Sequence, residues 1–101
     1  MEFKPDDHEA WHNRGVALVN LGKWEEAIDS YDKAIELKPD DHKAFYSKAC
    51  CYALQNNANL AIQNLEQAIN LNTDEYQKMA KTDTNFDSIR NDAGFQALMQ
   101  E

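Results

Sequence analysis

Residues 9–41 read EAWHNRGVALVNLGKWEEAIDSYDKAIELKPDD, and this stretch predicts two amphipathic helices that fold back on each other. In its first half, Trp11, Gly15 and Leu18 are spaced four and three residues apart, which places them on one helical face. The second half shows the same spacing at Ala27, Ile28, Tyr31, Ala34, Ile35 and Leu37. Gly22 lies between the two halves. It can end the first helix there, because glycine readily adopts the left-handed conformation that ends a helix. Two short helices with one apolar stripe each need a neighbour of the same kind.

That neighbour follows 34 residues later in the chain. At this offset Phe45 takes the place of Trp11, and Ala49 takes the place of Gly15. Identical residues recur at His8, Ala10, Ala27, Ile28, Ala34, Ile35, Leu37 and Asp40 and at His42, Ala44, Ala61, Ile62, Ala68, Ile69, Leu71 and Asp74. Self-similarity at a fixed period, with a helix pair in each copy, is typical of a stacked solenoid.

The segment before the first helix carries the same signal. Residues 2–8 read EFKPDDH and residues 36–42 read ELKPDDH, which agree at six of seven positions. The start of the chain therefore resembles the end of an earlier repeat. We expect the chain to be the end of a longer repeat protein, or one whose first helix pair was removed.

The repeated unit resembles the tetratricopeptide repeat. The residues that carry the resemblance are Trp11, Gly15, Leu18, Ala27, Tyr31, Ala34 and Pro39, then Phe45, Ala49, Tyr52, Ala61, Leu65 and Ala68. The resemblance implies an all-α, right-handed helical solenoid that forms a single domain over residues 1–101. Repeat 1 then spans about residues 8–41 and repeat 2 about residues 42–75, with a fifth helix and a capping tail over about residues 74–101.

The helix signals within this framework set approximate bounds. Helices are expected at about residues 8–21, 23–37, 41–55, 59–71 and 74–81. Asp6 or Asp7 can cap the first helix, and Thr73 is expected to cap the fifth. Small residues are expected to let paired helices approach closely, Gly15 beside Ala27 in the first repeat.

The tail departs from the repeat pattern. Phe86 and Ile89 make one apolar turn, and Asp92 can cap a last short helix. An end of a solenoid needs a cover for its open apolar side, and this tail has the required amphipathicity. It resembles an ending common in bacterial, especially cyanobacterial, tetratricopeptide proteins, through Thr82, Asp83, Phe86, Asp87, Ile89, Arg90, Asp92, Phe95 and Leu98.

Composition narrows the classes of function. The net charge of −8 opposes binding to nucleic acid or to anionic membranes, both of which need basic surfaces. No apolar run approaches the roughly 20 residues that span a bilayer. Cys50 and Cys51 are adjacent in a predicted helix and point about 100° apart, so a bond between them is not expected. Free thiols favour a cytoplasmic location.

One stretch matches a catalytic pattern. His8-Glu9-Ala10-Trp11-His12 fits the H-E-x-x-H motif of zinc hydrolases, in which two histidines bind the metal and the glutamate activates water. The structural interpretation is favoured, because Trp11 is already assigned to the repeat core and His8 recurs as His42 with no second histidine after it. We therefore expect no catalytic residues, no metal site and no cofactor.

The resemblance implies a binding surface in the concave groove that the first helix of each repeat lines. By position, the groove residues are His12, Val16, Val19, Asn20, Lys43, Tyr46, Ser47, Cys50, Leu54, Gln77 and Lys81. The function that follows is a non-catalytic protein-interaction module, which holds an extended peptide or a helix of a partner protein. The first alternative is a purely structural end of a longer repeat scaffold, and the second is a zinc hydrolase.

The N-terminal side of the first helix is expected to be uncovered. Ala10 and Ala17 lie on this side, and nothing in the chain precedes them to pack there. Exposed apolar patches on small proteins usually find a partner, and a second copy is the most available one. We therefore expect a weak homodimer through this edge, opposed by the net charge.

Overall fold

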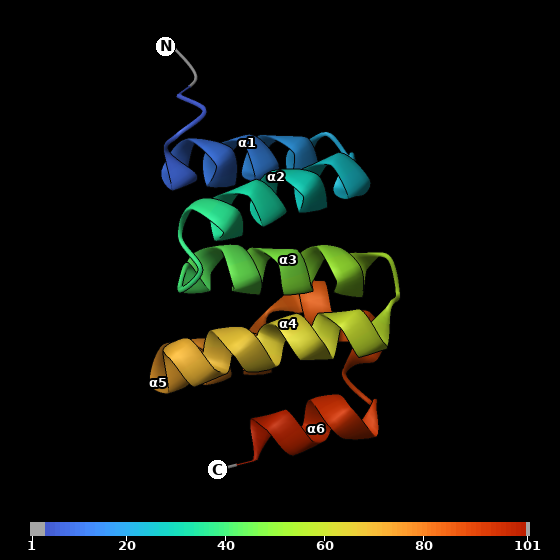
Figure 1. The fold of residues 1–101 in the computed structure, drawn as a ribbon. Coiled ribbons are helices and arrows are strands. Elements are labelled where there is room, and N and C mark those ends of the chain that lie inside the picture. The colour runs from blue at the N-terminus through green and yellow to red at the C-terminus, as the bar shows by residue number, and fades with distance from the viewer. Residues whose placement is uncertain (1–3, 101) are drawn as a thin grey trace.

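The computed structural model describes residues 4–100, which form a stack of helices (Figure 1). The elements are α1 (His8–Asn20), α2 (Trp24–Leu37), α3 (His42–Leu54), α4 (Ala58–Leu71), α5 (Thr73–Thr82), the 3-10 helix η1 (Thr84–Ile89) and α6 (Ala93–Met99). No strand occurs within the described range. The all-α helical repeat fold is therefore confirmed.

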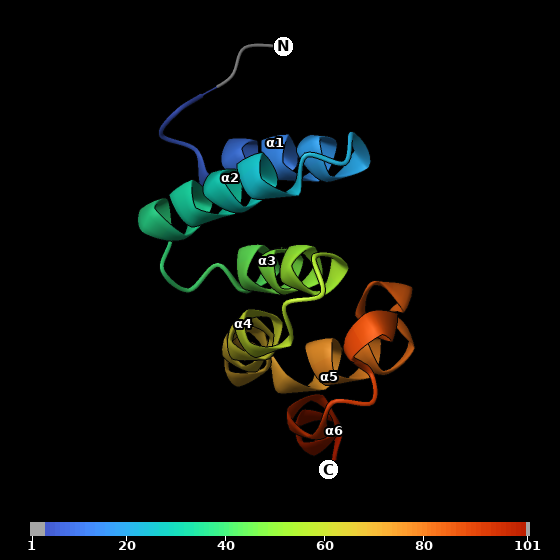
Figure 2. The ribbon, with the colours of Figure 1, turned by 90° about the vertical axis from the view of Figure 1, so that its right-hand side faces the viewer.

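Two antiparallel hairpins, α1 with α2 and α3 with α4, stack along the long axis of a molecule that measures 41 × 26 × 19 Å. α2 lies between α1 and α3, so the second helix of one hairpin packs on the first helix of the next. α5 follows α4 without a second helix of its own, and η1 and α6 complete the chain. Figure 2 shows η1 on the side of α3 and α5 that faces away from α4.

The two hairpin turns are built alike, as their sequences predict. Gly22 and Asn56 both adopt positive φ angles, 75° and 60°. In the first turn the N–H of Lys23 donates to the carbonyl of Leu18 over 2.9 Å, and the equivalent bond of the second turn measures 2.8 Å. These bonds satisfy carbonyl groups that the end of each helix leaves without a partner.

The helix ends agree with the sequence expectations within one residue, apart from one cap. Asp7 caps α1 as expected, since its carboxylate accepts from the N–H of Glu9 over 2.9 Å. Thr73 was expected to precede α5, but it is the first helical residue, and Asn72 occupies the capping position. The prediction was wrong because the chain leaves α4 and enters α5 through a single extended residue, Asn72 at φ −155°.

Close packing inside the first hairpin depends on Gly15, and the atoms nearest to it belong to Tyr31. A Cβ atom at Gly15 would lie only 2.5 Å from Cε1 of Tyr31, so the phenol ring fills the space that a side chain would take. Ala27, the expected neighbour, is fully buried in the same cluster. In the second hairpin the equivalent pair is Ala49 and Leu65. Ala49 is larger than Gly15, and Leu65 is correspondingly smaller than Tyr31.

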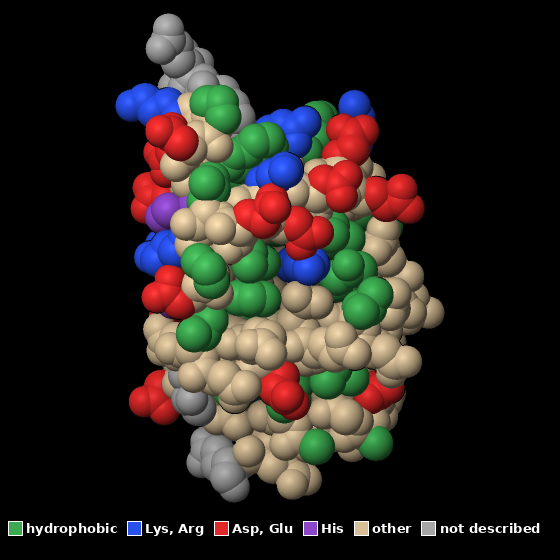
Figure 3. Space-filling model, viewed as in Figure 1, with side chains coloured by type: hydrophobic (Ala, Val, Ile, Leu, Met, Phe, Trp, Pro, Cys, Tyr) green, Lys and Arg blue, Asp and Glu red, His purple; other side chains and the backbone are tan. Residues whose placement is uncertain are grey.

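None of the helices in residues 4–100 combines the length and the apolar character needed to cross a membrane. Charged side chains are unevenly spread on the face shown in Figure 3. They gather over α1, α2 and α3, whereas the region of α4 and α6 carries mostly uncharged side chains.

The contact between Gly15 and Tyr31 yields a test in which the effect of one substitution on stability changes sign with the residue at position 31. Gly15→Ala gains up to about 1 kcal/mol of helix propensity, but overpacking against the buried Tyr31 ring costs about 1–3 kcal/mol. We expect net destabilisation in urea unfolding followed by circular dichroism. In a Tyr31→Leu background, which reproduces the pair of the second hairpin, the same Gly15→Ala change should stabilise. Equal effects in both backgrounds would contradict this packing.

Candidate functional site

Helices α1, α3 and α5 form one surface, here called the first-helix face. Side chains on this face link each helix to the next one. His12 Nε2 forms a hydrogen bond with Ser47 Oγ over 3.0 Å, which joins α1 to α3. His42 Nδ1 bonds to the Tyr76 hydroxyl and joins α3 to α5. The face is therefore a connected surface rather than three separate helices.

His8 makes the third of these links. Its Nδ1 lies 3.0 Å from Oδ2 of Asp41, the buried residue that precedes α3. The other carboxylate oxygen of Asp41 caps α3 by accepting from the N–H of Ala44 over 3.2 Å. One carboxylate therefore starts α3 and holds it against the beginning of α1.

His12 sits in the half-buried middle of the face. Burial lowers the pKa of His12, because the charged imidazolium would lose contact with water, and this outweighs the opposing attraction of Asp41. Lys43 lowers the pKa further by charge repulsion. The imidazole is therefore neutral at pH 7, where it can both donate and accept a hydrogen bond.

A pocket of about 220 Å³ opens where the three helices meet. Its lining residues come from all three: His12, Lys43, Tyr46, Ser47, Glu75, Tyr76 and Met79. Lys43 and Glu75 supply exposed opposite charges, and Met79 is a 42% exposed apolar side chain. A second pocket, of about 380 Å³, shares His12 and Lys43 with the first and extends to Lys38 and His42. Together the two pockets form the open part of the first-helix face.

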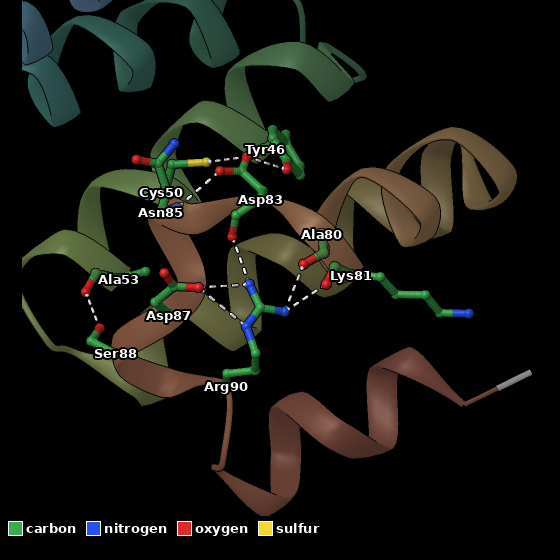
Figure 4. A network of polar contacts seen from close by, with 10 residues as sticks. All are labelled: Tyr46, Cys50, Ala53, Ala80, Lys81, Asp83, Asn85, Asp87, Ser88 and Arg90. Atoms are coloured by element: carbon green, nitrogen blue, oxygen red, sulfur yellow. Dashed lines mark hydrogen bonds and ion pairs between the residues drawn. The ribbon is translucent and has the colours of Figure 1, made fainter.

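The part of the face along α3 beyond these pockets is covered by the chain itself (Figure 4). Asp83, which precedes η1, places its Oδ2 where the Tyr46 hydroxyl donates to it over 2.6 Å and the Cys50 thiol over 3.9 Å. Phe86 is fully buried, and its ring packs edge-on against Tyr46 with centroids 5.7 Å apart. The Ser88 hydroxyl donates to the last turn of α3 over 2.8 Å. η1 thus lies along α3 as a bound segment would.

Arg90 ties this segment to the end of α5. Its guanidinium donates to the carbonyl oxygens of Lys81 and Asp83, each over 2.7 Å, and pairs with Asp87 over 3.1 Å (Figure 4). A cation at a helix C-terminus is favoured by the partial negative charge of the free carbonyls. The guanidinium also lies 5.6 Å from the ring centroid of Phe95 in α6. Arg90 therefore joins α5, η1 and α6.

The structure distributes the predicted groove residues between three settings. His12, Lys43, Tyr46 and Ser47 line the open part, and Val16 is exposed on α1. Tyr46 and Cys50 also contact Asp83, while the Gln77 amide donates to the carbonyls of Leu98 and Gln100. The others lie outside the two pockets of the open part, namely Val19, Asn20, Leu54 and Lys81.

Sequence reasoning did not include Glu75, Tyr76 and Met79, although all three line the open pocket. The 34-residue shift relates two of them to earlier residues, but to residues that were not predicted for the groove, so it does not identify them as groove residues. Tyr76 corresponds to His42 and Met79 corresponds to Phe45 at this offset. The covering of α3 by Asp83 and Phe86 carries no such periodic signal, because the tail lies outside the repeat.

The candidate catalytic groups are engaged in structural contacts. His8 and His12, the histidines of the H-E-x-x-H match, bond to different partners, Asp41 and Ser47. Among residues 4–100, no three His, Cys, Asp or Glu side chains are grouped so that they could hold a metal ion. Burial raises the pKa of the Cys51 thiol to about 12, and burial together with Asp83 raises that of Cys50. Neither thiol readily forms the nucleophilic thiolate at neutral pH.

Two models of the tetratricopeptide repeat family match the chain, one over residues 8–41 and the other over residues 30–63. Together they cover more than half of its 101 residues. The first match coincides with α1, α2 and the turn that follows. No curated protein matches the chain.

The lowered pKa of His12 predicts a pH-dependent stability. The unfolded chain binds a proton at this residue near pH 6.5, whereas the folded chain binds it only at lower pH. The free energy of unfolding should therefore fall as pH drops from about 7 to 5, and this part of the loss should vanish in His12→Asn. Urea titrations across this range measure it. A His12→Asn profile as steep as that of the unsubstituted chain would contradict the assignment.

The burial of Phe86 predicts that the tail is part of the folded core. Phe86→Ala should lower the free energy of unfolding by about 3–5 kcal/mol, because it removes a fully buried ring. Met79→Ala, at an exposed position of α5, is the control and should cost less than about 1 kcal/mol. Denaturant unfolding measures both changes. Equal losses of unfolding free energy in the two variants would show that η1 does not support the fold.

Proposed function

Because the chain belongs to the tetratricopeptide repeat family, whose repeats generally mediate protein–protein interactions, we propose that it is a non-catalytic module that binds a partner protein. The binding site is the open part of the first-helix face. An extended peptide or one helix of the partner is the ligand. The two free cysteines support a reducing compartment such as the cytoplasm.

One observation carries this proposal. The pocket between α1, α3 and α5 stays open at the point where η1 stops covering the face. The chain places a neutral imidazole, a hydroxyl, two opposite charges and an apolar side chain around this opening. Such a lining suits a peptide that carries one apolar side chain between polar groups.

The chemistry of the lining suggests how such a peptide binds. Its apolar side chain would rest on Met79, whose side chain is 42% exposed in the free protein. An acidic group would lie near Lys43, and a basic or amide group near Glu75. His12 and Ser47 already share a hydrogen bond, so the peptide backbone would meet a preorganised polar pair.

The structural role in a longer scaffold is the second candidate. It is favoured by the fact that the chain fills part of its own first-helix face through Asp83 and Phe86. A scaffold end of this kind would bind no peptide at the remaining pocket.

A peptide selection separates the two candidates. Peptides displayed on phage are selected against the folded chain, and their affinities are then measured for Lys43→Glu and for Lys33→Glu. Both variants carry the same change of charge, but Lys33 is exposed on α2 and lines neither of the two pockets. We expect Lys43→Glu alone to weaken binding by about tenfold, as removal of a central contact does. Equal weakening by both variants, or no selected peptide, would refute the groove as the site.

A further inference from the structure

The pocket of about 380 Å³ on the first-helix face contains every histidine of the chain. His8 and His12 come from α1, and His42 begins α3. The connection between α2 and α3 contributes Lys38 and Asp41. Figure 3 shows acidic, basic and histidine side chains together at this edge of the molecule. We call this cavity the histidine pocket.

The imidazoles decide the charge of the histidine pocket. Lys38 and Lys43 supply two positive charges to its lining, and Glu9 and Asp41 supply two negative charges. These charges cancel, so the lining is neutral while the three histidines are neutral. Each imidazole that binds a proton then adds one positive charge. The lining therefore becomes cationic within the range in which histidine titrates, about pH 5 to 8.

One of the two carboxylates is already engaged by the protein. Asp41 is buried, its Oδ2 lies 3.0 Å from His8 Nδ1, and its Oδ1 accepts from the N–H of Ala44 over 3.2 Å. Because a carboxylate only accepts, Nδ1 of His8 carries the proton in the neutral ring, and Nε2 becomes a donor when the ring is protonated. Glu9 is exposed, so water screens its charge.

The other two histidines are half-buried and are each held by one hydrogen bond, His12 to Ser47 and His42 to Tyr76. Burial lowers the pKa of His12, and the charged groups that act on this ring include Asp41, His8 and Lys43, which line the same pocket. An anion placed among these groups would favour the imidazolium and raise the pKa of His12.

The elements that pack around the pocket leave this titration to the histidines. α2 contributes the ring of Tyr31, whose centroid lies 5.5 Å from that of His12. α5 contributes Tyr76, and the exposed carboxylate of Glu75 lines the neighbouring pocket with Lys43. Burial raises the pKa of Tyr76 to about 12 and also raises that of Tyr31. Both phenols are therefore neutral where the histidines titrate.

We propose that the histidine pocket binds a doubly charged oxyanion, the phosphoryl group of a phosphorylated serine or threonine in the partner peptide. The proposal rests on the proposed function, because this pocket belongs to the open part of the first-helix face. Basic side chains reach the space from α1, from α3 and from the connection before α3. A phosphoryl group offers three acceptor oxygens in different directions, whereas a carboxylate offers two in one plane. Binding takes up protons and strengthens as the histidines become charged.

The neighbouring pocket limits the sequence of such a peptide. It shares His12 and Lys43 with the histidine pocket and contains the exposed side chain of Met79. An apolar residue that rests on Met79 would therefore lie close to the phosphorylated residue.

Sulfate is the probe, because it keeps both charges across this range, whereas a phosphoryl group gains its second charge only near about pH 6. It is titrated into the isotopically labelled chain at about pH 5.5 and pH 7.5, with chloride adjusted to hold ionic strength constant, and followed by NMR. We expect saturable shifts at His12, His42 and Lys43. The dissociation constant should be about tenfold lower at the lower pH, since binding takes up roughly one proton.

Three exposed positions locate the site without disturbing the core. Lys38→Gln should weaken sulfate binding about threefold, and Glu9→Gln should strengthen it about threefold, the size of effect expected for exposed charges. Lys33→Gln makes the same change of charge as Lys38→Gln on α2, outside the histidine pocket, and should have no effect.

Peptide arrays identify the source of the oxyanion. An array with a fixed phosphoserine should give binders that the same array with serine does not give. Equal binding of the two arrays would show that the peptide does not deliver the oxyanion, which would overturn the proposal.

Other results would overturn it as well. Acetate that binds as tightly as sulfate would make the pocket a carboxylate site. Sulfate binding that is absent, that is equally strong at both pH values or that Lys33→Gln and Lys38→Gln weaken equally would remove the histidine pocket as the site. The proposed function fails separately: selected peptides that depend on Lys43 without sulfate binding would leave it standing, and sulfate binding without any peptide binder would refute it.

Discussion

Burial of the apolar side of each helix hairpin by the next element is the constraint on which the rest of this structure depends. α1 and α2 bury one stripe against each other, and α2 turns its other apolar side to α3. The fully buried Ala44 and Cys51 of α3 show how closely these hairpins approach. A stack built this way has two ends, and each end presents a surface of the type that is buried inside the stack.

After α5 the chain continues with two elements, η1 and α6, that do not form a repeat. η1 and α6 replace the missing second helix after α5, and Phe86 and Phe95 are almost fully buried as a result. η1 lies along α3, and α6 packs against α4 and α5. The same segment therefore stabilises the fold and limits the surface that remains for a partner.

Polar contacts decide how the first helices are aligned. His8, His12 and His42 each reach a residue 33 to 35 positions later, so the hydrogen bonds follow the repeat almost as regularly as the apolar core does. At the next step the pattern changes, because Tyr46 donates to Asp83 of the tail. The open part of the face ends where this change occurs. Its position is thus a consequence of the tail and not of the repeat.

The sequence by itself determined the helices, the hairpin turns, the 34-residue unit and the residues that face the core. These features depend on local spacing, on glycine and asparagine at positive φ and on helix caps such as Asp7, all of which are visible in a short window. Only the tertiary structure decided that the Tyr31 ring limits the size of residue 15, and that Asp83 covers Tyr46 and Cys50. Both depend on where a long side chain or a non-repeating segment lies in three dimensions. Spacing along the chain specifies which side of a helix is apolar, but the element that finally covers that side is set by the packing of the whole molecule.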